Sequence, residues 1–227
     1  MVLCQGKIRA FFTKMAGILR FMKIKTHVTI AKIAWDACAD RNQFGIGAKC
    51  AFCFGALWPD FSPMQLVHPH FFRQSHRYVF KQLERLCFHG TGGKKLLYFF
   101  RMGKIAHYLS DFCCFPHVQG HLCQIRQHIL YERMQNRYMI RYQDHFTGLP
   151  AATTNRIPHI LQEYRKETAQ IGGSFCLDLE KAIEVCQALL RACRVHQENK
   201  GVDKYRSPVS GKITTTVFPA FSGRNPY

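Results

Sequence analysis

The sequence predicts an all-α fold, a compact bundle of several helices, for three reasons. Apolar residues recur at helical spacing along most of the chain, for example over residues 26–37 and 175–195. The chain has no series of short alternating segments separated by turn residues, and no internal repeat. The glycine-rich run at residues 89–95 lacks the first glycine of a nucleotide-binding loop and follows no strand, so we expect a flexible connection there.

The first two expected helices are rich in small and apolar residues. A helix over residues 26–37 has Thr26 as its candidate N-cap and apolar residues at helical spacing. The second, over residues 44–57, contains glycines that are tolerated where helices pack closely. Its Cys50 and Cys53 form a CxxC, but without a second CxxC they indicate core residues rather than zinc ligands.

Prolines and glycines divide the next part of the chain. Pro59 and Pro63 are expected to stop the second helix, so that Asp60 emerges in an extended loop. A helix is then expected over residues 75–86, followed by a central helix over about residues 95–115. The last expected helices lie at residues 121–142, 158–170 and 175–195.

The charge balance points to anionic partners. Lys and Arg number 32 against 14 Asp and Glu, which gives a formal net charge of +18. Such a protein attracts phosphodiester substrates, nucleic acid or an anionic membrane surface. Its 11 cysteines show no regular spacing, so we expect free thiols in a reducing cytoplasm rather than a disulfide framework. No segment is long and apolar enough to predict a transmembrane helix.

We expect one helical domain over residues 22–196, flanked by two basic segments. Residues 1–21 are basic and amphipathic, and they lack a clean signal-peptide core. We interpret them as an extension from a misassigned start, with Met22 opening the product, although a targeting or membrane-touching helix is an alternative. Residues 197–227 are polar and basic without periodicity, and we expect a loosely ordered tail.

Two histidine–carboxylate pairs stand at helical spacing. His107 and Asp111 are four residues apart within an almost wholly apolar helix, so both side chains project from one face. His128 and Glu132 repeat this spacing in the following helix, and His117 lies between the two pairs. A single pair could be a hydrogen-bonded pair in the core, but the repetition favours a divalent-metal site.

Further candidate ligands lie before the central helix. Asp60 follows the second helix, where its alternative role is that of a turn or capping residue. His68, His70 and His76 fall within nine residues, which is more than a solvated loop requires. His27 lies in the first turn of the first helix, where a surface or capping role is the alternative.

Five segments together resemble the bacterial zinc-dependent phospholipase C family: THVTIA, GALWPD, HPHFFRQS, FRMGKIAHYLSDFCCFPH and HILYE. The resemblance covers roughly residues 22–139, and it includes the order of ligand types and the H-x3-D-x5-H and H-x3-E spacings. The same superfamily contains zinc-dependent nucleases that act on single strands. The resemblance implies an all-α fold with a zinc cluster in a cleft, and hydrolysis of phosphodiester bonds.

The resemblance also implies which residues hold zinc. One zinc would be held by Asp60, His70, His107 and Asp111. A second would be held by His117, His128 and Glu132. The family's third zinc uses the early histidine, here His27, together with the carboxylate that corresponds to Asp111 and an N-terminal Trp exposed by processing. No Trp precedes Thr26, so we expect two zinc ions and leave the third open.

Three functions compete at this point. The first is a phospholipase C-type hydrolase, in which paired zinc ions polarise the phosphoryl oxygen and activate water, and Asp60 orients or deprotonates that water. The second is a single-strand nuclease, which the positive charge favours. The third is a non-catalytic, metal-stabilised helical protein that binds acidic partners or membranes.

Overall fold

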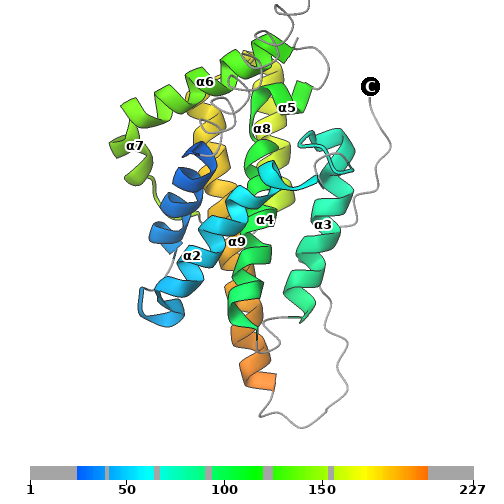
Figure 1. Ribbon diagram of the computed structural model, residues 1–227, viewed down its shortest axis with the longest axis vertical. Coiled ribbons are helices and arrows are strands. Elements are labelled where there is room, and N and C mark those ends of the chain that lie inside the picture. Colours follow the sequence, from blue (N-terminus) through cyan, green and yellow to red (C-terminus); the bar gives the residue numbers. More distant parts are fainter. Residues whose placement is uncertain are drawn as a thin grey trace, which may run out of the picture.

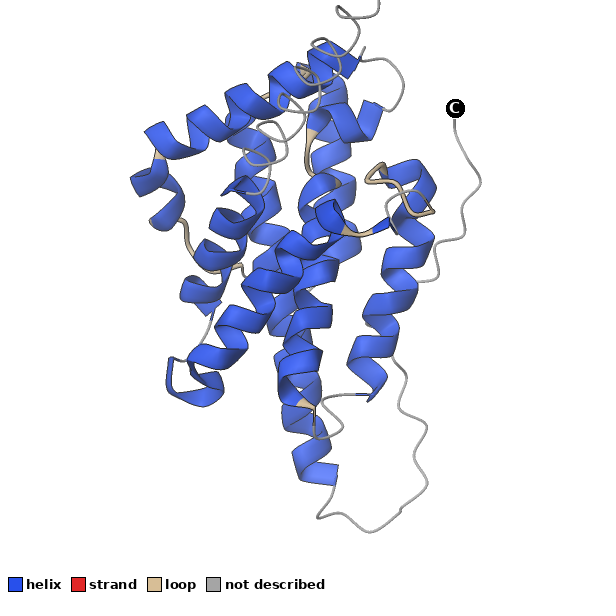
Figure 2. Ribbon diagram, in the orientation of Figure 1, coloured by secondary structure: helices blue, strands red, loops and turns tan. Residues whose placement is uncertain are grey.

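A computed structural model describes residues 25–38, 41–63, 67–89, 94–119, 125–152 and 156–203. Within these ranges every regular element is a helix, so the expected all-α fold is confirmed (Figure 2). A first helix covers residues 25–38. The others are α2 (Arg41–Phe61), α3 (Phe72–His89), α4 (Lys95–Asp111), α5 (Phe115–Gln119), α6 (Ile125–Arg141), α7 (Gln143–Thr147), α8 (Ile157–Ile171) and α9 (Phe175–Asp203).

The helix α4 runs through the centre of the fold. Its residues from Ile105 to Asp111 are all buried, and it packs against α2, α3 and α9 (Figure 1). Two glycines allow α2 and α4 to cross in contact. A Cβ atom on Gly55 would lie 2.1 Å from the carbonyl oxygen of Phe100, and one on Gly103 would lie 2.0 Å from that of Phe52. The expectation that glycines serve close helix packing is therefore confirmed at this crossing.

The buried carboxylate of Asp178 joins the remaining helices. It accepts hydrogen bonds from the Phe115 backbone N–H at 3.0 Å, the Tyr131 hydroxyl at 2.8 Å and the Tyr164 hydroxyl at 2.7 Å. These contacts tie the first turn of α9 to α5, α6 and α8. Burial raises the pKa of Asp178 to about 6, because desolvation outweighs the hydrogen bonds that favour its charged form.

The ends of α2 and α4 differ from the sequence prediction. The helix α2 continues through Pro59 to Phe61, and Asp60 lies in its last turn with 7% of its surface exposed, not in an extended loop. A proline this close to the end removes a single backbone bond, and the Ser62 N–H still reaches the Trp58 carbonyl at 3.1 Å. The helix α4 ends at Asp111 rather than Phe115, because a turn at residues 112–114 precedes α5.

Three smaller expectations are also corrected. A short helix, α7, occupies part of the loop expected at residues 143–157. The helix α9 extends to Asp203, beyond its expected end at residue 195. Cys50 is exposed and not a core residue, because it lies four residues after the 83%-exposed Ile46 on the outward face of α2.

The expected extension over residues 1–21 and the part of the expected tail from residue 204 onward lie outside the described residues. In the helices that are described, none combines the length and the apolar character needed to cross a bilayer.

Candidate metal centre

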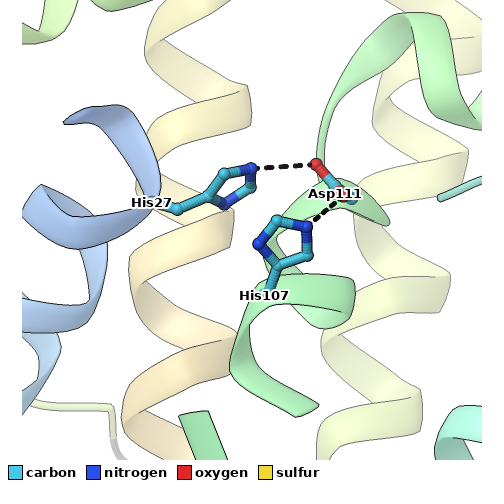
Figure 3. A group of neighbouring side chains, drawn as sticks. All are labelled: His27, His107 and Asp111. Atoms are coloured by element: carbon cyan, nitrogen blue, oxygen red, sulfur yellow. Dashed lines mark ion pairs between the residues drawn. The ribbon is translucent and has the colours of Figure 1, made fainter. Parts of the chain in front are cut away.

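The carboxylate of Asp111, the last residue of α4, lies at the centre of four imidazoles. Its Oδ1 is 3.3 Å from His27 Nε2 and 3.9 Å from His117 Nε2. Its Oδ2 is 2.5 Å from His70 Nδ1 and 3.3 Å from His107 Nε2. Figure 3 shows this carboxylate paired with both His27, from the helix over residues 25–38, and His107, one turn earlier on α4. Four separate segments therefore converge on one side chain that is 2% exposed.

The protonation of His27 follows from its neighbours. The Ser110 hydroxyl donates to the His107 carbonyl at 2.8 Å, so its oxygen accepts the Nδ1–H of His27 at 2.9 Å. The proton then resides on Nδ1, and the bare Nε2 faces Asp111. Burial lowers the pKa of His27, and the neighbouring His107 lowers it further, so the ring is held neutral. A neutral imidazole is the form that binds a metal.

His107 and His117 share this arrangement. Nδ1 of His107 donates to the Ala56 carbonyl at 2.8 Å, and Nδ1 of His117 donates to the His70 carbonyl at 3.2 Å. Both rings are at most 2% exposed. Their Nε2 atoms face carboxylate oxygens, Asp111 Oδ2 at 3.3 Å from His107 and Glu132 Oε1 at 3.1 Å from His117, and His107 Nε2 also lies 3.0 Å from His70 Nδ1. A cation would be bound from several sides by atoms placed in this way, and a carbonyl on the far nitrogen is the usual second contact of metal-binding histidines.

The candidate residues form three neighbouring groups, in each of which the potential ligand atoms lie within 4.8 Å of one another. These groups are His27, His107 and Asp111; then Asp60, His70 and His107; and then His117, His128 and Glu132. In the second group Asp60 Oδ1 is 3.7 Å from His107 Nε2. In the third, Glu132 Oε1 is 3.1 Å from His117 Nε2 and 2.9 Å from His128 Nε2.

A comparison of the sequence with models of protein families identifies the family of this chain. The family model for zinc-dependent phospholipase C matches residues 26–197. The chain belongs to the zinc-dependent phospholipase C family. No curated protein and no solved structure matches it. The match reaches beyond residue 139, where the sequence motifs end, so α8 and most of α9 are included in the family domain.

The donor atoms fit the metal that gives this zinc-dependent family its name. Imidazole nitrogen and carboxylate oxygen are both common zinc ligands, and all three groups offer this mixture. The described residues thus contain clusters suited to zinc, as the sequence predicted, while the number of ions stays a prediction.

The structure distinguishes between the three histidines that the sequence offered as candidate ligands before the central helix. His70 faces Asp111, as described above. The ring of His68 stacks on Tyr78 with centroids 3.7 Å apart, and the ring of His76 stacks on Phe72. Among the described residues, neither His68 nor His76 belongs to a group that could hold a metal.

A pocket opens beside the first and third groups. Its lining includes Thr26, His27, Ser110, Asp111, Glu132 and Gln135. Sequence reasoning did not identify Ser110 or Gln135, because neither is a metal ligand by type. Ser110 could have been suspected from its place beside Asp111, but its contact with His27 depends on how the helix over residues 25–38 packs on α4.

Proposed function

We propose that this protein is a zinc-dependent phosphodiester hydrolase of phospholipase C type, which releases diacylglycerol and a phosphorylated head group. The observation that carries the proposal is the convergence of bare imidazole nitrogens on buried carboxylate oxygens around Asp111. Membership of the zinc-dependent phospholipase C family supports the same reaction class.

Each group would hold its metal with the residues that the sequence suggested. Zinc supplies a Lewis acid for the phosphoryl oxygen and lowers the pKa of water. One position would use Asp60, His70, His107 and Asp111. A second would use His117, His128 and Glu132. His27 and Asp111 would contribute to a third position.

Asp60 is the residue we propose for proton transfer. Its carboxylate lies in the last turn of α2, 7% exposed, with Oδ1 3.7 Å from His107 Nε2. In this position it can orient an attacking water and accept its proton, provided that the substrate phosphate lies against the same cluster. The buried surroundings limit competing water.

The outer face of α2 favours a lipid surface over a nucleic acid strand. Ile46, Phe54, Trp58 and Phe61 on this face are 83%, 54%, 40% and 56% exposed. Trp58 and Phe61 lie in the same last turn of α2 as the buried Asp60, so the apolar face and the candidate site lie at the same end of this helix. Aromatic and aliphatic side chains together suit a membrane interface. The three aromatic rings offer stacking surface to bases as well, so Ile46, the most exposed of the four, is the residue that favours the lipid surface.

Basic side chains accompany this apolar face. Phe100 of α4 packs against Phe54 and Trp58, with ring centroids 5.8 and 5.7 Å away. Arg101 follows it and is exposed, and Lys104 is half-buried one turn later. Apolar side chains beside cations suit an anionic membrane, so we propose peripheral binding there. A cytoplasmic location stays a prediction.

A nuclease is the second candidate, and the net charge of +18 is the observation that favours it. The two activities differ in their salt dependence. Binding to single strands should weaken steeply as salt rises, because each phosphate contact releases counterions. Binding to vesicles that uses the α2 face should retain its apolar contribution at high salt.

The test begins with the zinc content of the purified protein. Hydrolysis of phospholipid vesicles and of single-stranded DNA is then measured before chelation, after chelation and after zinc is restored. We expect vesicle hydrolysis that chelation abolishes and zinc restores. Asp111→Asn should lose zinc and activity together, whereas His159→Ala, on the exposed part of α8, should retain both. An Asp111→Asn variant with full zinc content and full activity would show that the site is assigned wrongly.

A further inference from the structure

A fourth group of metal-binding side chains lies away from the candidate metal centre, where α7 meets the first turns of α9. His145 Nε2 is 2.8 Å from Glu180 Oε1, and Cys176 Sγ is 3.4 Å from the same oxygen. Cys176 Sγ and His145 Nε2 are 4.0 Å apart. We propose that these three residues bind one zinc ion, at a site separate from the proposed hydrolytic centre.

The separations between donor atoms are close to those that zinc imposes. Tetrahedral coordination at ordinary zinc–nitrogen, zinc–oxygen and zinc–sulfur bond lengths places neighbouring donor atoms roughly 3.4–3.6 Å apart. Of the three observed distances, 2.8 Å is below this range, 3.4 Å is within it and 4.0 Å is above it. Small side-chain rotations therefore suffice to admit the ion, with no movement of the backbone.

The backbone already holds the donor atoms on two fixed elements. Cys176 and Glu180 are one helical turn apart on α9, so they project side by side. His145 comes from α7, which is anchored by the fully buried ring of Phe146. The ion would therefore cross-link two elements that are separated by about thirty residues of chain.

The chemistry of the three donors selects zinc. A thiolate, a carboxylate and a neutral imidazole carry two negative charges, which match a divalent cation. A soft sulfur ligand disfavours magnesium and calcium and favours zinc. Binding transfers no electrons: a sulfur–zinc bond forms and the Cys176 thiol releases its proton to solvent. The half-exposed His145 leaves room for a water molecule as the fourth ligand.

The thiol makes this site distinguishable from the proposed hydrolytic centre, whose described candidate ligands are nitrogen and oxygen atoms only. In protein loaded with Co²⁺, a thiolate ligand gives a near-ultraviolet sulfur-to-cobalt charge-transfer band. We expect this band in the wild-type chain. We expect Cys176→Ser to lose it together with one zinc per chain, while hydrolysis, if the proposed function holds, is retained.

Cys50→Ser is the matched control, because Cys50 is an exposed cysteine on the distant helix α2. This variant should keep the band and the full zinc content. His145→Ala should lose the band while its thiol is intact, which separates ligand loss from a direct effect on sulfur. Circular dichroism checks that each variant is folded. A wild-type protein without the band, or a Cys176→Ser protein that keeps it, would overturn the proposal whether or not the protein is a hydrolase.

Discussion

Replacing Asp178 with Asn should change how stability depends on pH, and the size of the change follows from the burial of this residue. Burial raises the pKa of Asp178 from its ordinary value of 3.8 to about 6. The folded protein therefore holds this proton more tightly than the unfolded chain does, and binding of the proton stabilises the fold. This contribution to the unfolding free energy is fully present below the ordinary pKa of 3.8 and is lost as the pH rises through about 6. The full effect is about 3 kcal/mol.

An accessible pH range captures part of this effect. Between about pH 5 and about pH 8, wild-type protein should lose about 1.4 kcal/mol of unfolding free energy relative to Asp178→Asn, whose amide stays neutral. Urea unfolding of both proteins at each pH, under identical metal conditions, measures this difference, since the titration of shared histidines cancels. The reasoning would be refuted if the difference in unfolding free energy between the two proteins did not change with pH. It would also be refuted if the wild-type protein became more stable relative to Asp178→Asn as the pH rose.

Three further predictions concern the helix crossing, the apolar face and the metal centre. Gly103→Ala should lower the unfolding free energy by about 1–3 kcal/mol, because its Cβ would meet an α2 carbonyl at 2.0 Å; Gly47→Ala, with no atom nearer than 3.5 Å, should not. Equal melting temperatures for Gly103→Ala and the wild-type protein would contradict this prediction. Trp58→Ala should weaken binding to anionic vesicles in a sedimentation assay without slowing hydrolysis of a soluble phosphodiester; slower soluble hydrolysis would instead give Trp58 a role in the reaction. Ser110→Ala should lower zinc affinity about 10–100-fold in a chelator competition, because His27 Nδ1 loses its acceptor. Unchanged affinity would exclude this role for Ser110.

The sequence was sufficient where ligands lie on one helix. His107 and Asp111 share α4, and His128 and Glu132 share α6, so the helical repeat alone places each pair on one face. The recurrence of apolar residues at helical spacing was likewise enough to predict an all-α fold. Such features depend on local geometry, which a spacing of residues determines directly.

Contacts between different segments of the chain could not be predicted from residue spacing. Asp111 meets His27 and His70 only because the helix over residues 25–38 and the segment before α3 both pack on the end of α4. The exposure of Cys50 depends on which face of α2 the crossing at Gly55 buries. Each of these features depends on how the helices pack. Packing is determined by many side chains together, and no fixed spacing of residues in the sequence encodes it.

The ends of α2 and α4 suggest why a cation belongs in this fold. Asp60 lies in the last turn of α2, and Asp111 is the last residue of α4. The C-terminal end of a helix already carries partial negative charge, so a carboxylate there is unfavourable, and neither helix has a basic residue in its last turn. Both carboxylates are also at least nine-tenths buried, in a chain with 32 basic residues that could have been placed nearby. The fold thus brings two carboxylates and two helix ends to one place and surrounds them with imidazoles, an arrangement that a bound divalent cation would stabilise.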